Sequence, residues 1–279
     1  MRSIFGVAIL AAILAASLGF LGLSLPVSAQ TTPLVKLQTL DDNRGWEAVG
    51  KLVLGDYGFC TGALITPQLV LTAAHCLFDK ETGARIDPAQ IKFLAGWRNG
   101  RAEAYRGARQ AVAHPDYVYG GADQLDRVSV DVALVELDQP ILLPSVHPFA
   151  VAESPAKGDT VGVVSYAQDR ADTPSLQQSC TVMERQEGVL VMTCDVDFGS
   201  SGAPVFREVD GVPQVVSVIS AKAEMAGRQV SLGSALQIPL ADLMAELAQG
   251  SARPGAMGNV RTLSGGGGGG AQFIKPNAP

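Results

Sequence analysis

The chain has 279 residues, of which 47% are hydrophobic and 17% charged, and its formal net charge is −6. This composition predicts a globular protein with a sizeable core. It argues against a nucleic-acid-binding protein, because lysine and arginine are not clustered, and no basic amphipathic stretch indicates a helix on a membrane surface.

Residues 1–29 have the pattern of a secretory signal peptide. Arg2 precedes a long apolar run, and the small residues Val27-Ser28-Ala29 form a cleavage site before Gln30. The pattern predicts a secreted or periplasmic protein that does not contact the membrane after cleavage. The apolar run is longer than usual for a signal, so an uncleaved membrane anchor is the alternative that stays open.

Short runs rich in valine, isoleucine, leucine and aromatic residues recur from Lys51 onward, between turn residues. Such runs are typical of β-strands. Their close spacing, without long helices between them, predicts an all-β antiparallel barrel or sandwich and not a parallel α/β sheet. The runs are residues 51–65, 68–76, 91–97, 131–137, 161–167, 188–194, 203–209, 213–221 and 230–238.

Turns rich in proline and glycine between Pro140 and Gly158 divide the strand-rich region into two halves. We expect a first unit at 46–150 and a second at 151–250, preceded by an N-terminal segment or short propeptide at 30–45. One amphipathic helix ending by Gly250 should close the second unit, since apolar residues recur there at helical spacing. These residues are Leu240, Leu243, Met244 and Leu247.

The last segment, residues 251–279, contains six consecutive glycines and no hydrophobic period. It cannot offset the entropy of ordering by burying apolar surface. We therefore predict a disordered tail.

Four cysteines, all after the predicted signal, allow three disulfide pairings. In an oxidising compartment, pairing of neighbours would join Cys60 to Cys76 and Cys180 to Cys194, closing two loops of similar length. A zinc site is the competing interpretation. No two of the cysteines have the C-x-x-C spacing that is typical of such sites, so we expect no metal.

The stretch CDVDFGSSGAPVF, residues 194–206, contains two candidate nucleophiles, Ser200 and Ser201. A serine hydroxyl needs a general base, and all three histidines precede it in the chain. This order excludes an α/β-hydrolase, whose G-x-S-x-G motif also fails because Ala203 occupies the last position. Two of the histidines, His114 and His147, are followed by proline and are expected in turns.

The motif LTAAHC, residues 71–76, resembles the histidine motif of the chymotrypsin-like (trypsin-like) serine peptidases. DVALVEL resembles the aspartate motif of this family and GSSGAP its serine motif, and HPDY resembles a segment that many members carry. The resemblance implies a catalytic triad of His75, Asp131 and Ser201. It also implies two six-stranded antiparallel β-barrels over about residues 46–249, with a C-terminal helix, and a mechanism that needs no cofactor.

The glycine two residues before Ser201 supports this choice of nucleophile. Gly199 allows the backbone to turn so that its N–H points, together with that of Ser201, at a developing oxyanion. If Ser200 were the nucleophile, the corresponding residue would be Phe198, whose side chain suits such a turn poorly.

The sequence departs from the family in its activation motif. Many members pair a newly freed N-terminus, usually I-V-G-G, with an aspartate before the serine, but Ser200 occupies that place and no such motif precedes Trp46. We expect no trypsin-like zymogen switch. In this respect the chain is similar to bacterial secreted members, including the glutamyl endopeptidase type.

The residues that would set substrate selectivity are less well defined. Asp195 lies six residues before Ser201, where trypsin-like members place the aspartate that selects arginine or lysine, but Cys194 is displaced from the position of the family's cysteine. Asp195 and Asp197 therefore also fit ordinary turn acids. The opposite wall of the pocket should come from residues 216–221, including Ser220.

These features favour a secreted, monomeric serine endopeptidase that acts on proteins or peptides, with selectivity for arginine or lysine as the finer hypothesis. A catalytically silent binding protein with the same fold is the first alternative. An esterase that uses the same triad is the second.

Overall fold

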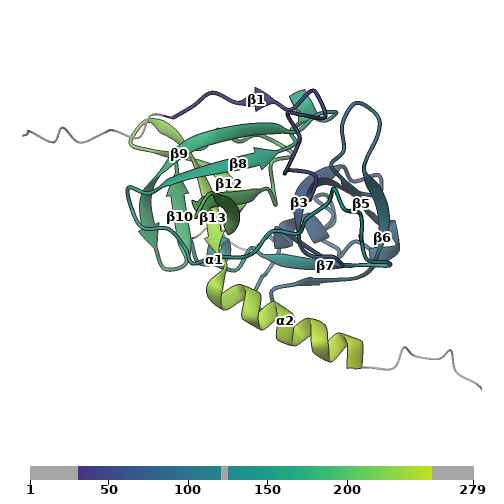
Figure 1. Cartoon of the computed structure of the whole chain (residues 1–279). Helices are drawn as coiled ribbons and strands as arrows, with labels where there is room; N and C mark the ends of the chain where they lie inside the picture. Colours follow the sequence, from purple (N-terminus) through teal and green to yellow (C-terminus); the bar gives the residue numbers. More distant parts are fainter. Residues whose placement is uncertain (1–30, 121–124, 253–279) are drawn as a thin grey trace, which may run out of the picture.

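The computed structural model describes residues 31–120 and 125–252, which form two antiparallel β-barrels and a C-terminal helix (Figure 1). This architecture confirms the predicted fold class. The predicted signal peptide at 1–29 and residues 253–279 of the predicted tail lie outside the described residues.

The first barrel is closed, with the strand order β2-β3-β4-β7-β6-β5 and a final pairing of β5 with β2. All its neighbouring strands are antiparallel. The strands are β2 (Val49–Leu54), β3 (Phe59–Thr66), β4 (Leu69–Thr72), β5 (Ile91–Ala95), β6 (Ala104–Ala113) and β7 (Ala133–Leu137).

Two glycines in the first barrel leave room for one buried aromatic ring. A Cβ atom at Gly50 would lie 2.4 Å from the Phe93 ring, and one at Gly62 would lie 2.6 Å from Val70 Cγ1 and 3.7 Å from the same ring. Glycine therefore leaves the space that the fully buried Phe93 ring occupies.

The second barrel follows the strand order β9-β10-β13-β12-β11-β8 and closes where β8 pairs with β9. The short strand β1 (Val35–Lys36) adds to the outside of β9, and Figure 1 shows it lying across this barrel. The strands are β8 (Thr160–Ser165), β9 (Ser175–Gln186), β10 (Val189–Met192), β11 (Pro204–Val209), β12 (Val212–Met225) and β13 (Arg228–Ala235).

The two barrels differ in how their cores are built. The core cluster of the second barrel contains mainly valine and lacks aromatic side chains among the described residues, whereas the cluster of the first contains several rings. Three rings, Trp46, Phe149 and Phe206, pack together with centroids 4.7–6.1 Å apart. Since Phe206 belongs to β11 of the second barrel, these contacts join the two barrels.

The sequence patterns did not predict strands β6 and β9. Most β6 side chains are only half-buried, and the strand carries Arg106 and Arg109. Strand β9 carries Gln177 and Gln178 in its first half. Their hydrophobic alternation is weak because one face of each strand is partly open to solvent, which is the condition under which pattern-based prediction of strands fails.

The C-terminal helix α2 (Gln237–Ala252) begins directly after β13 and packs against β6 and β7 of the first barrel. Figure 1 shows it running below both barrels. Leu243 and Leu247 are buried, as the helical spacing predicts, whereas Met244 is 43% exposed. The helix extends two residues into the predicted tail. Within the described part of the chain, no helix is long and apolar enough to cross a membrane.

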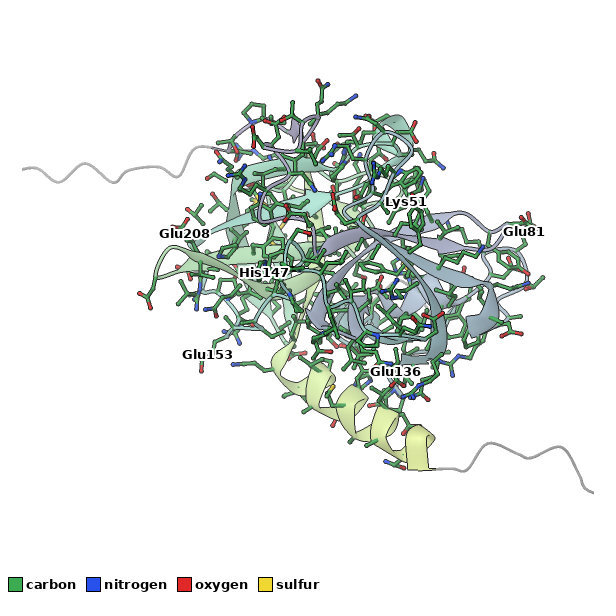
Figure 2. The ribbon with its side chains drawn as sticks, turned by 45° about the vertical axis from the view of Figure 1, so that its right-hand side comes forward. Lys51, Glu81, Glu136, His147, Glu153 and Glu208 are labelled. Atoms are coloured by element: carbon green, nitrogen blue, oxygen red, sulfur yellow. A yellow bond between two sulfur atoms is a disulfide. The ribbon has the colours of Figure 1, made fainter. Side chains whose placement is uncertain are left out.

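Charged side chains are spread around the surface. Figure 2 shows Glu81, Glu153 and Glu208 at three separate edges of the molecule, and all three are exposed.

Candidate active site

His75 lies in a short 3₁₀ helix, η1 (Ala74–Leu77), directly after β4. Its backbone N–H donates to Asp131 Oδ1 at 2.8 Å, and its ring Nδ1 lies 2.7 Å from Asp131 Oδ2. An ionised carboxylate only accepts hydrogen bonds, so this contact places the ring proton on Nδ1. The other nitrogen, Nε2, is then free to act as a base.

Asp131 lies two residues before β7 and is 3% exposed. The Ser220 hydroxyl donates a third hydrogen bond to this carboxylate, with Oγ 2.5 Å from Oδ2. Burial alone raises the pKa of Asp131, but the charge and hydrogen bonds of His75, together with Ser220, outweigh it and hold this pKa below its ordinary value. The carboxylate therefore stays ionised and can orient the His75 ring.

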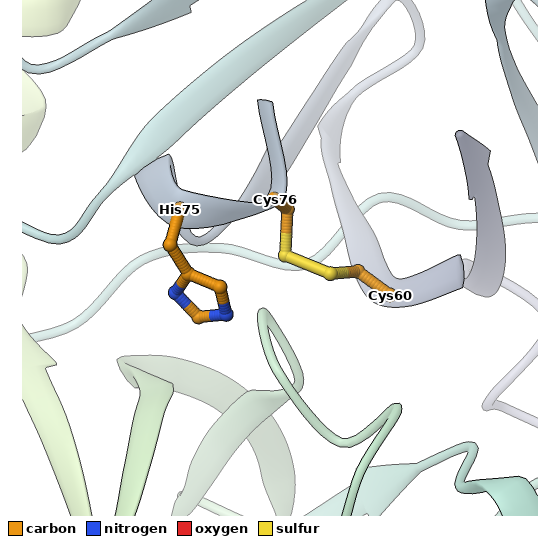
Figure 3. A group of neighbouring side chains, drawn as sticks. All are labelled: Cys60, His75 and Cys76. Atoms are coloured by element: carbon orange, nitrogen blue, oxygen red, sulfur yellow. A yellow bond between two sulfur atoms is a disulfide. The ribbon is translucent and has the colours of Figure 1, made fainter. Parts of the chain in front are cut away.

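A disulfide anchors the histidine turn. Cys76 is bonded to Cys60 of β3, as Figure 3 shows, and the structure confirms the predicted local pairing. The side chains of Cys60, His75 and Cys76 lie close enough to suggest a metal site. Their chemistry does not fit one, because the two sulfurs are bonded to each other and are not thiolates.

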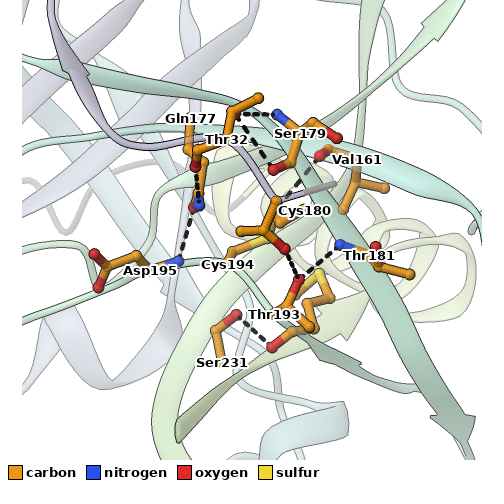
Figure 4. The surroundings of a disulfide bond; sticks show 12 residues. Thr32, Val161, Gln177, Ser179, Cys180, Thr181, Thr193, Cys194, Asp195 and Ser231 are labelled. Atoms are coloured by element: carbon orange, nitrogen blue, oxygen red, sulfur yellow. Dashed lines mark hydrogen bonds between the residues drawn. A yellow bond between two sulfur atoms is a disulfide. The ribbon is translucent and has the colours of Figure 1, made fainter. Parts of the chain in front are cut away.

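The second predicted disulfide joins Cys180 of β9 to Cys194 (Figure 4). Both residues are buried in the core of the second barrel. The chain emerges from this bridge only seven residues before Ser201, so the disulfide fixes the start of the serine loop, residues 195–203.

The serine loop is closed by short backbone hydrogen bonds. Ser200 N donates to Asp197 O at 2.8 Å, and Ala203 N donates to Ser200 O at 2.9 Å. Two further bonds attach the loop to its surroundings: Gly202 N donates to Ile219 O at 2.8 Å, and Thr61 N of the first barrel donates to Ser201 O at 2.8 Å.

Two glycines of this loop are required by space and by conformation. Gly199 has φ +97° and Gly202 has φ +77°, a region that other residues rarely adopt. A Cβ atom at Gly199 would lie 2.5 Å from the Phe59 ring, and one at Gly202 would lie 2.4 Å from Thr61 O. The loop can therefore approach the first barrel only because these positions lack side chains.

The backbone N–H groups of Gly199 and Ser201 make no hydrogen bond within the described residues. Each belongs to a peptide group whose carbonyl is held on the other side: Gln168 N donates to Phe198 O at 2.8 Å, and Ala203 N donates to Ser200 O. In a trans peptide the N–H points away from the carbonyl. Both N–H groups are thus free to bind an oxyanion.

The two serines of the loop have different environments. Ser200 is fully buried, and its hydroxyl contacts Ser165, Tyr166 O, Asp197 N and Arg170 at 3.3 Å each. Ser201 is partly exposed and lines a hollow of about 420 Å³. Only Ser201 can meet a substrate.

The structure brings His75 to Asp131 but does not join Ser201 to His75. Among the described residues, no hydrogen bond links Ser201 Oγ to the His75 ring. In free enzymes such catalytic bonds are often long and tighten when substrate binds.

The hollow beside Ser201 contains some of the residues expected to set selectivity. Ser220 lies in its wall, although its hydroxyl is bonded to Asp131. Asp195 is not part of the lining: it is exposed, and its N–H donates to Gln177 Oε1 at 2.8 Å (Figure 4). The lining residues are Val196, Asp197, Phe198, Ser201, Ile219, Ser220, Ala221 and Lys222.

Some site residues could not be identified from the sequence. Thr61 lies between the two barrels, where its hydroxyl donates to Gly199 O at 2.9 Å and accepts from Tyr166 N at 3.0 Å. Thr72 donates to Thr61 O at 2.9 Å. Threonines are common on strands, so nothing in the local sequence marks these two.

A family model described as Trypsin matches residues 41–233, and the chain therefore belongs to the trypsin family of serine proteases. It is 27% identical over 152 residues to a glutamyl endopeptidase of Bacillus licheniformis, a match covering 54% of the chain and 46% of that protein. It is also 29% identical over 110 residues to trypsin-1 of Salmo salar, covering 39% and 40% of the two chains.

The alignments span less than half the length of these curated relatives. A solved structure of a Glu endopeptidase in complex with MPD matches with a TM-score of 0.65 and 17% identity, covering 80% of this chain and 100% of that one. At this identity the match shows the shared fold.

Proposed function

We propose that the protein is a serine endopeptidase that hydrolyses peptide bonds through an acyl-enzyme on Ser201. The observation that carries this proposal is the pair of hydrogen bonds from His75 to the buried Asp131 carboxylate. Ser220 links this carboxylate to the hollow of Ser201, in a loop with two free N–H groups. Membership of the trypsin family supports the same chemistry.

The mechanism uses groups of the chain alone. Ser201 Oγ attacks the carbonyl carbon while His75 Nε2 takes its proton, and the resulting oxyanion accepts hydrogen bonds from the N–H groups of Gly199 and Ser201. The C–N bond then breaks as His75 returns the proton to the leaving amine. Water, deprotonated by His75, hydrolyses the acyl-enzyme and restores Ser201. Asp131 holds the ring tautomer and stabilises the imidazolium.

Labelling with a fluorophosphonate probe and digestion of a peptide library test this proposal. Wild-type protein should be labelled and should cut peptides, and Ser201→Ala should do neither. Ser145→Ala is the matched control, since Ser145 is exposed and lies outside the site. Absence of labelling in the folded wild type would favour the silent binding protein, and cleavage of esters without peptides would favour the esterase.

The finer proposal is selectivity for arginine or lysine, and it needs an anion in the hollow beside Ser201. Asp195 lies outside the lining, whereas Asp197 lies in it together with Lys222. Cuts after basic residues that are lost in Asp197→Asn would support basic selectivity through Asp197. Cuts after acidic residues that are lost in Lys222→Met would contradict it.

We also propose that the mature protein is monomeric and is exported to the cell exterior or the periplasm. Two disulfides support an oxidising compartment. The segment before Trp46 is attached to the second barrel: Thr32 N donates to Ser179 O at 2.8 Å, and Val35 pairs with Leu176. Figure 4 shows Thr32 beside Ser179. This attachment supports a mature chain that retains residues 31–45. N-terminal sequencing of exported protein and its sedimentation velocity test these points.

A further inference from the structure

The short turn η3 (Gln168–Arg170) lies directly against the serine loop, although 30 residues separate Arg170 from Ser200. It follows β8 and contacts the loop in two ways: Gln168 N donates to Phe198 O, and Arg170 contacts Ser200. The preceding residue, Ala167, lies so close that its Cα would be 3.0 Å from a Cβ at Gly199.

Arg170 is an unusual residue to find in this place. Its side chain is only 6% exposed, and its one ionic contact among the described residues joins Nη1 to Asp169 Oδ1 at 3.3 Å, where the Asp169 side chain is 71% exposed. Its Nε makes no hydrogen bond within the described part of the chain. Burying a guanidinium costs free energy unless its N–H groups are hydrogen-bonded, so the contacts that Arg170 does make are needed to stabilise it.

These contacts join two segments. The Nη2 atom of Arg170 carries two N–H groups and lies 3.1 Å from Ser165 Oγ and 3.3 Å from Ser200 Oγ, so each N–H has one acceptor. Ser165 is the last residue of β8, and Ser200 belongs to the serine loop. The planar, rigid guanidinium therefore fixes the loop relative to the barrel wall.

Gln168 provides the link to the reaction. Its backbone N–H holds the Phe198 carbonyl, which belongs to the same peptide group as the Gly199 N–H. If this peptide rotated, the N–H would turn away from the oxyanion position. The hydrogen bond from Gln168 therefore selects the orientation that catalysis needs.

We propose that η3 positions the oxyanion-binding N–H of Gly199, with the Gln168 N–H as the contact and Arg170 as its buried anchor. This role rests on the proposed peptidase function. Because the anchor is an internal side chain, the loop takes its active form as the chain folds and needs no newly freed N-terminus.

The substitutions Gln168→Pro and Gln168→Ala test the contact as a matched pair. Both remove the same exposed side chain, but only proline removes the backbone N–H. The backbone admits proline at this position, because Gln168 is the first residue of its turn and Ala167 is extended, with φ −149° and ψ 170°. The Cδ atom of proline takes the place of the N–H hydrogen, so the Phe198 carbonyl, whose oxygen lies 2.8 Å from Gln168 N, must also move away.

We expect kcat of Gln168→Pro to fall about 100-fold, as for the loss of one oxyanion donor, with KM within about twofold of wild type. Affinity for a peptide aldehyde, which forms an oxyanion on Ser201, should fall in parallel, while Gln168→Ala keeps wild-type values. A merely structural role would lower the melting temperature without this split.

The substitutions Arg170→Met and Arg170→Lys test the anchor. We expect kcat of the methionine variant to fall about tenfold, and lysine, which can still donate to one of the serines, to restore part of the loss. Arg185→Met, at an exposed position of β9, is the control and should match wild type.

Different outcomes overturn different proposals. A folded Gln168→Pro protein with the kcat of Gln168→Ala overturns the positioning role alone. If Arg170→Met does not fold, the Gln168 pair still decides. A wild type that neither cuts peptides nor reacts with fluorophosphonate overturns the proposed function and, with it, this role.

Discussion

The two halves of the site are held in different ways. In the first barrel, His75 makes two hydrogen bonds to the ionised carboxylate of Asp131. Ser220 of the second barrel donates a third hydrogen bond to this carboxylate. In the serine loop, backbone hydrogen bonds and the close packing of Gly199 and Gly202 fix the geometry. The first half depends on charge and the second on shape, so different changes should break each of them.

The largest effect is expected at the charge-dependent half. Asp131→Asn keeps the size of the side chain but removes the charge that sets the His75 tautomer, and kcat should fall about 10⁴-fold with little change in KM. Steady-state kinetics of the purified variant checks this. A loss below tenfold would show that His75 is oriented without the carboxylate.

A smaller loss is expected at the shape-dependent half. In Gly199→Ala, the new methyl group would meet the Phe59 ring at 2.5 Å and should displace the N–H, lowering kcat about 10²- to 10³-fold. Gly211→Ala is the control: its φ is +79° with nothing within 4 Å, so it adds backbone strain without crowding. Equal kcat in both variants would contradict the role of close packing.

The two disulfides allow the two halves of the site to be compared directly, since Cys60–Cys76 lies beside His75 and Cys180–Cys194 lies at the start of the serine loop. The bridges close loops with sequence separations of 16 and 14, so each double Cys→Ala variant should lose about 3 kcal/mol of unfolding free energy. Urea titration measures this. The variant that lacks the Cys60–Cys76 bridge should also have a lower kcat than the variant that lacks the other bridge, because Cys76 adjoins His75. A difference in stability above about 1.5 kcal/mol would show that loop length does not dominate.

The smallest effect is expected at Ser220. Ser220→Ala removes one of three hydrogen bonds to Asp131 and should cost about 1.5 kcal/mol at neutral pH. The pKa of Asp131 is depressed in the folded protein, so its contribution to stability is present above the ordinary pKa and is lost as the pH falls through the folded value.

Without Ser220 the pKa of Asp131 should rise toward its ordinary value. The acid-induced loss of stability begins at the unfolded-state pKa in both proteins, so in the variant it should be smaller than in wild type and should be complete at a higher pH. Thermal unfolding measured between pH 2 and 7 checks the direction, and an unchanged or opposite shift would show that Ser220 does not stabilise the carboxylate.

Most of the fold follows from local sequence. Buried strands such as β4 and β10 are continuous apolar runs and are predicted directly. The half-exposed strands β6 and β9 are not, because their pairing is decided by the barrel and not by their own pattern.

The candidate site likewise contains residues that the sequence predicts and residues that it does not. His75, Asp131 and Ser201 lie in short motifs that the sequence displays. Arg170 and Gln168 lie in no such motif, since their proposed roles arise from contacts with a loop 30 residues away. Counting back six residues from Ser201 reaches Asp195, which the structure leaves exposed and outside the lining of the hollow.

The C-terminal helix has a consequence for how the two barrels are held together. Helix α2 leaves β13 of the second barrel and packs on β6 and β7 of the first, where Asp242 lies 3.4 Å from the buried His114 ring. His75 and Ser201 belong to different barrels, so this helix joins the two sides of the candidate site, by the chain on one side and by packing on the other. An engineered crosslink between α2 and β6 would make this connection covalent at both ends without altering any residue of the site.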